Sequence, residues 1–162
     1  MDSRRHETEA EKYDRNWIEL LQELRVAQTG VQILAGFLLT LPFSNRFASL
    51  AHGYRVLFLV AFGLACVAIA LIIAPVSAHR FLFGRHEKDV LVRVSSGFAK
   101  VGLVALALTI VAVVVLIFGV VMGTVTGLLA GAAMLSLFLV VWVLLPLRLL
   151  RPRPGAGSGH RA

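Results

Sequence analysis

The stretch that decides the fold is Val101–Leu147, VGLVALALTIVAVVVLIFGVVMGTVTGLLAGAAMLSLFLVVWVLLPL, which contains 47 residues and no charged side chain. A helix of about 20 apolar residues crosses the roughly 30 Å hydrocarbon core of a bilayer. The stretch is therefore long enough for two membrane-spanning helices joined by a tight turn. Small residues are densest around Met122-Gly123-Thr124. We expect the turn there, and so a helical hairpin within a membrane.

Two more apolar stretches precede this one, and the whole chain is unusually apolar. Residues 26–45 are uncharged between Arg25 and Arg46, with Pro42 near the end, and residues 56–76 follow a short loop. Hydrophobic residues make up 58% of the chain, mean hydropathy is +0.83, and only 15% of residues are charged, against about 25% in soluble domains. We predict an all-α membrane protein, an up-down bundle of four transmembrane helices, with spans at about 26–43, 56–76, 98–120 and 125–145.

The two ends of the chain differ from this membrane domain, which we place at residues 16–147. Residues 1–15 are densely charged and are expected to be disordered, as is the basic tail 148–162. Asn16 is a good helix N-cap, and Glu19 stands at the capping-box position. Trp17, Leu20 and Leu24 follow at helical spacing, which predicts a short N-terminal amphipathic helix that runs into the first span.

The positive charges indicate how the four spans are oriented. The N-terminal region, the connection over residues 79–97 with Lys100 just after it, and the tail together hold 14 of the 16 Lys and Arg residues. Only Arg46 and Arg55 belong to the two other connections, where Tyr54 fits the aromatic belt of the outer interface. The positive-inside rule places the 14 in the cytoplasm, with both termini. There the basic residues are expected to contact anionic phospholipid. Arg outnumbers Lys 13 to 3, which is typical of a GC-rich bacterial genome and favours a bacterial plasma (inner) membrane.

The first span carries the most distinctive polar pattern of the membrane domain. We define the polar stripe as Arg25, Gln28, Thr29, Gln32 and Thr40, which fall within an arc of about 120° at 100° per residue. Polar groups against lipid tails cost several kcal/mol, so we expect the stripe to face other helices. Two interpretations stay open: hydrogen bonds between helices, or a polar pathway or ligand site closed by Arg25.

Two smaller features offer candidate sites. Gly123, Gly127 and Gly131 form a GxxxGxxxG run assigned to the fourth helix, and small residues four apart let helix backbones approach closely, within the chain or across a dimer. His79 and Arg80 close the second span. They either cap the end of its helix, where positive charge meets the dipole, or handle protons.

Catalytic and nucleic-acid functions lack the patterns that they require. The sequence contains no Walker loop, nucleophile elbow or zinc-protease motif, and no His, Asp or Glu pair has a recognised metal spacing. We therefore expect no enzyme, no cofactor and no metal site. The net charge is +7, but the basic residues flank apolar segments, so we expect no nucleic-acid binding.

Two strings give the chain a family resemblance. ELLQELRVAQTGVQIL at 19–34 with LLTLPF at 38–43, and APVSAHR at 74–80 with Phe83 and Lys88, resemble an uncharacterised family of small four-helix bacterial membrane proteins. Some of its members are labelled sodium/proton antiporters by automatic transfer. The resemblance covers residues 14–147 and implies four spans, but it supplies no catalytic residues.

Two functions follow from these patterns. The first is a structural or regulatory membrane protein whose partner is itself or another membrane protein. The alternative is cation/proton transport of the sodium/proton antiporter type along the polar stripe. Ion-coupled transporters use ionisable groups inside the membrane, and the spans contain no Asp or Glu, which favours the first function.

Overall fold

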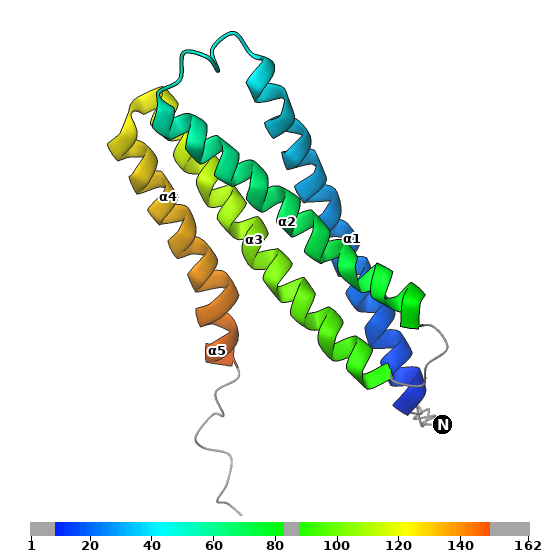
Figure 1. Ribbon diagram of the computed structural model, residues 1–162. Coiled ribbons are helices and arrows are strands. Elements are labelled where there is room, and N and C mark those ends of the chain that lie inside the picture. Colours follow the sequence, from blue (N-terminus) through cyan, green and yellow to red (C-terminus); the bar gives the residue numbers. More distant parts are fainter. Residues whose placement is uncertain (1–8, 83–87, 150–162) are drawn as a thin grey trace, which may run out of the picture.

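The computed structural model describes residues 9–82 and 88–149, and its long elements are four antiparallel α-helices (Figure 1). Helix α1 covers Glu9–Thr40, α2 His52–Leu82, α3 Lys88–Met122 and α4 Thr124–Leu139. Each contributes a segment long and apolar enough to cross a membrane: Leu21–Phe43, His52–Pro75, Gly97–Met122 and Thr124–Leu149. The predicted fold class, all-helical with four candidate spans, is confirmed, and these segments indicate a multi-pass membrane protein.

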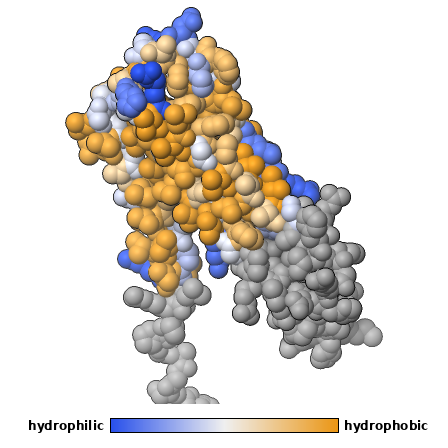
Figure 2. Space-filling model, viewed as in Figure 1, coloured by the Kyte–Doolittle hydropathy of each residue, from blue (hydrophilic) through white to orange (hydrophobic). Residues whose placement is uncertain are grey.

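The four helices form an open row rather than a closed square. Helices α2 and α3 pack along their length, with α1 on one flank and α4 on the other (Figure 1). Helix α1 also contacts α3, but in the described part of the chain α1 and α4 do not pack against each other. Most of the visible surface over the helices is apolar (Figure 2), as the lipid-facing side of a membrane protein must be.

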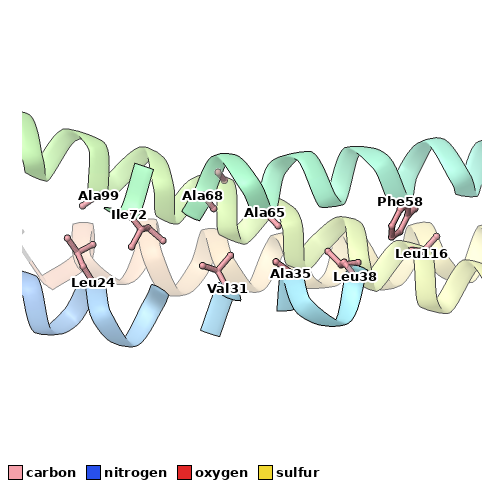
Figure 3. Close-up of a cluster of buried hydrophobic side chains, with 11 residues drawn as sticks. Leu24, Val31, Ala35, Leu38, Phe58, Ala65, Ala68, Ile72, Ala99 and Leu116 are labelled. Carbon is pink, nitrogen blue, oxygen red and sulfur yellow. The ribbon is translucent and has the colours of Figure 1, made fainter. Parts of the chain in front are cut away.

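The core lies where α1, α2 and α3 meet, and small residues bring these helices together. On α2 the buried positions are spaced alternately three and four residues apart, as in coiled-coil packing. They are Phe58, Ala61, Ala65, Ala68, Ile72 and Pro75. Phe58, Ala65, Ala68 and Ile72 form one buried cluster with Leu24, Val31, Ala35 and Leu38 of α1 and Ala99, Ala105 and Leu116 of α3 (Figure 3). Four of the six α2 positions are alanine or proline, so the backbones can approach closely.

The N-terminal part of α1 differs from the prediction. The helix begins at Glu9 and continues without interruption to Thr40, so Asn16 lies inside it and is no N-cap. Residues 9–15 are helical rather than disordered. The expected amphipathic helix is the first part of α1 and runs into the first span, as predicted. An exposed pair four residues apart, Arg15 and Glu19 at 3.9 Å, adds local support. Residues 1–8 lie outside the described residues.

Prolines interrupt the helices less than the sequence indicates. Pro42 does end α1, in the short 3-10 helix η1, Leu41–Phe43. Pro75 lies inside α2, which continues to Leu82, so the connection predicted from residue 79 is shorter. The fourth span, predicted to end at residue 145, also continues past a proline, Pro146. A π-helical segment, η2 (Val140–Leu144), leads into α5 (Leu145–Leu149). The wider π turn accommodates the missing N–H of Pro146. Residues 150–162 lie outside the described residues.

Candidate functional site

The polar stripe lies on α1, and most of it faces away from the rest of the chain. Arg25, Thr29, Gln32 and Thr40 are exposed, and Gln28 is half-buried. The expectation that these side chains face other helices of the same chain is therefore not met for four of the five.

The reason is that apolar residues occupy the packed face of α1. Leu24, Val31 and Leu38 belong to the buried cluster against α2 and α3 (Figure 3). At 100° per residue, the centre of the polar stripe lies about 120° around the helix from that face. Gln28 stands at the border between the two faces, which explains its partial burial. Burying the apolar face turns the polar stripe outward.

The five polar side chains differ in how well they are hydrogen-bonded. The Thr29 hydroxyl donates to the Arg25 carbonyl at 3.0 Å, and the Thr40 hydroxyl donates to the Phe37 carbonyl at 2.7 Å. The side-chain amides of Gln28 and Gln32 have no hydrogen-bond partner among the described residues. A free amide in hydrocarbon costs several kcal/mol. The two glutamines are therefore the groups of the stripe that need an external partner.

Of the two glutamines, Gln32 lies deeper in the candidate span. The candidate span begins at Leu21 and ends at Phe43. With a rise of 1.5 Å per residue, Gln28 and Gln32 lie about 10 Å and 16 Å along the helix from Leu21. Gln32, at the middle of the span, is too far from either end for a glutamine side chain to reach the interface, whereas Gln28 lies nearer the start. Arg25, nearer the start, can extend toward the headgroups.

The predicted site at His79 and Arg80 is described only by its backbone. His79 and Arg80 lie in the last turn of α2, but their side chains are outside the described residues, so both interpretations of this pair stay predictions.

The three glycines have two different positions. Gly123 is the turn between α3 and α4, with φ 96° and ψ 161°, and is not part of the fourth helix. Gly127 and Gly131 are buried on α4 against α3. A Cβ on Gly127 would lie 2.7 Å from the Val115 carbonyl oxygen and 2.8 Å from Gly119 Cα, and a Cβ on Gly131 would collide with the Val115 side chain. We call this contact, made by Val111, Val115, Gly119, Gly127 and Gly131, the α3–α4 seam.

Sequence reasoning missed a hydrogen-bonded clamp at the top of the seam. The Tyr54 hydroxyl donates to the Gly119 carbonyl at 2.8 Å. Because its single proton is engaged there, the Thr124 hydroxyl is the donor in their 3.0 Å contact. The clamp joins α2, α3 and α4. The absence of a side chain at Gly119 makes room for the ring, since a Cβ there would lie 2.7 Å from Tyr54 Cε1. In the sequence Tyr54 is indistinguishable from an interfacial anchor.

The described side chains provide little material for chemistry. Within residues 9–82 and 88–149, no three His, Cys, Asp or Glu side chains come together. Thr109, the buried polar residue of α3, already donates to the Ala105 carbonyl at 2.9 Å. The arrangement offers hydrogen-bonding amides on a helix face rather than a set of reacting groups.

Among comparisons with known proteins, only a family profile matches the chain. No curated protein and no solved structure shows significant similarity to the chain. The profile of a family of unknown function (DUF6328) matches residues 6–146, a segment that includes all four candidate spans except the last few residues of the fourth. The chain therefore belongs to this family of unknown function.

Proposed function

We propose that the chain is a non-enzymatic integral membrane protein that binds another membrane protein as its structural or regulatory partner, through the polar stripe of α1. The observation that carries the proposal is the pair of unsatisfied amides, Gln28 and Gln32, within a candidate span, with Gln32 at its middle. The partner that fits is a transmembrane helix that presents hydrogen-bonding side chains at the same depth.

Two physical arguments support this function over a lone membrane protein. Contacts between polar side chains of neighbouring membrane helices contribute about 0.6–2 kcal/mol each. The two unsatisfied glutamines of the stripe, Gln28 and Gln32, therefore favour association. The open row also leaves the outward side of α1 uncovered by α4.

The proposal includes the placement of the chain in a bacterial plasma membrane with both termini in the cytoplasm. The 14-to-2 distribution of Lys and Arg supports this orientation.

Site-specific photocrosslinking in cells tests the interaction. A photoreactive amino acid at position 32 should give a discrete crosslinked species with a second membrane protein, identified by mass spectrometry. The matched control is position 137 on α4, which has a similar depth in its span and is 55% exposed on an entirely apolar surface. We expect position 137 to give only lipid adducts.

Two outcomes would contradict the proposal. Equal crosslinking to many proteins at both positions would mean that the stripe has no preferred partner. A single crosslinked species with twice the mass of the chain would identify the stripe as a surface for self-association.

The same stripe motivates the alternative, cation/proton transport. The stripe lines no channel within one chain, so transport requires a second protein surface that encloses it. A sodium gradient across liposomes that contain the chain and an internal pH dye provides the test. Proton flux above that of empty vesicles, and its loss in Gln32→Leu, would support transport. Flux equal to that of empty vesicles would exclude it for the chain alone.

A further inference from the structure

An apolar cavity of about 210 Å³ lies at the end of the molecule where α1 connects to α2. Its walls come from η1 and the α1–α2 connection, from α2, and from the last turns of α3. The inner surface is formed by Phe58 and Leu116, which are 3% and 5% exposed. Phe47 stands edge-on to Phe58, with ring centroids 5.0 Å apart, and closes one side. The cavity is thus a formed hollow with an aromatic wall.

The cavity lies at the depth where a bilayer changes from acyl chains to headgroups. The first candidate span ends at Phe43 and the third at Met122. The cavity is lined on one side by Ser44 and Arg46, just beyond the first span, and on the other by Ile117, inside the third span and 54% exposed. One side therefore meets headgroups while the other meets acyl chains.

Arg46 is the group of the cavity with unused hydrogen-bond donors. The other hydroxyl or charged side chain in the lining, Ser44, already donates to the Leu41 carbonyl at 2.8 Å. No described residue forms a salt bridge with Arg46. None can do so at this end of the molecule, because the sequence contains no Asp or Glu between Arg25 and Glu87, nor between residues 101 and 147. An arginine presents five donors in a planar fork that matches phosphate oxygens.

We propose that this cavity is a binding site for one anionic phospholipid of the surrounding bilayer, with an acyl chain between Phe47, Phe58 and Leu116 and the phosphate on Arg46. Charge complementarity favours an anionic over a zwitterionic headgroup, because the site has a cation and no acid. The site is separate from the polar stripe and lies at the opposite end from the 14 basic residues that the sequence groups together. It is independent of the proposed partner function.

The chain offers a matched control for the charge. Arg55 belongs to the same end of the molecule, at the start of α2, but does not line the cavity. Arg46→Gln and Arg55→Gln therefore remove the same charge from the same end, and only the first removes the donor at the cavity. Ile117→Trp tests the apolar half, because a larger ring at this exposed lining position should fill the hollow.

Native mass spectrometry of the full chain in mild detergent measures the binding. Phosphatidylglycerol and phosphatidylcholine with identical acyl chains are added separately, and the fraction with a bound lipid is recorded. We expect preferential retention of phosphatidylglycerol. Arg46→Gln should weaken this binding about tenfold, as the loss of a charge-assisted hydrogen bond implies, while Arg55→Gln should change it less than twofold. Ile117→Trp should weaken binding of both lipids.

Three results would overturn the site. Equal retention of the two lipids by the unmodified chain would show that the headgroup charge does not contribute to binding. Equal losses in Arg46→Gln and Arg55→Gln would indicate attraction by overall charge rather than by a site. Displacement of the lipid by inorganic phosphate in millimolar amounts would show that the acyl chain is not held. Circular dichroism of each variant verifies that the helices are intact.

Discussion

The α3–α4 seam and the polar stripe of α1 lie on opposite flanks of the row of helices. The seam is closely packed, whereas the stripe is largely exposed. At the seam, glycines bring two backbones into contact, and the Tyr54–Gly119–Thr124 clamp closes one end. At the stripe, the chain places two unsatisfied amides on an exposed face. Close packing stabilises helices in a membrane, where burial of apolar surface supplies no driving force between them. The seam is therefore built for folding and the stripe for an external contact.

This contrast predicts that substitutions at the seam reduce the stability of the chain, whereas substitutions in the stripe reduce association and leave stability almost unchanged. Stability is measured by unfolding in mixed micelles of increasing denaturing-detergent content, followed by circular dichroism.

The largest effect is expected for Gly127→Val. The new side chain meets the Val115 carbonyl and the Gly119 backbone, neither of which can move aside. We expect a loss of about 3 kcal/mol in the free energy of unfolding, the upper range for overpacking. Gly63→Val is the control, because a Cβ there has nothing within 4 Å. Equal losses in the two variants would disprove the close contact at the seam.

Gly123→Ala should have the next largest effect. The turn holds φ at 96° and ψ at 161°, a combination that is essentially restricted to glycine. Forcing alanine into it costs about 2 kcal/mol. The same unfolding measurement applies, and Gly36→Ala, on the exposed face of α1, is the control. A turn that tolerates alanine without loss would mean that α3 and α4 connect differently.

Tyr54→Phe should reduce stability by about 1 kcal/mol, because hydrogen bonds between membrane helices contribute about 0.6–2 kcal/mol. Thr124→Val should reduce it by less, since it removes one bond of the two. A double-mutant cycle of these two substitutions measures their coupling. Strictly additive losses would show that the two hydroxyls do not interact.

Gln32→Leu should have the smallest effect on stability, within about 0.5 kcal/mol, as for other exposed positions. The crosslinked species formed from a photoreactive residue at position 29 should nevertheless disappear in this variant. Ile33→Leu, a neighbouring exposed position outside the stripe, should retain it. Loss of stability together with association would instead assign Gln32 to the fold of the single chain.

The sequence-based predictions agree with the structure at some residues and differ from it at others. The uncharged stretch 101–147 predicted two spans with a turn around Gly123, and the structure has both. Asn16 was misjudged as a cap because capping patterns are local, whereas the charged first turns of α1 are stabilised as part of a long helix. The fourth span was predicted to end at residue 145, but after a π turn the helix continues through Pro146 to Leu149. The cavity beside Arg46 combines three elements, so no local pattern could reveal it.

The sequence by itself determined the number of spans and that they are helical. The length and charge of an apolar run are local properties, and they can be compared directly with the thickness of a bilayer. Only the tertiary structure decided which side of α1 is covered. Apolar and polar residues share that helix, and lipid and helix interior differ little in hydrophobicity, so periodicity does not tell the packed face from the exposed one. Leu24, Val31 and Leu38 pack against α2 and α3, and this contact determines which side of α1 is covered. As a result, the side-chain amides of Gln28 and Gln32 have no hydrogen-bond partner among the described residues.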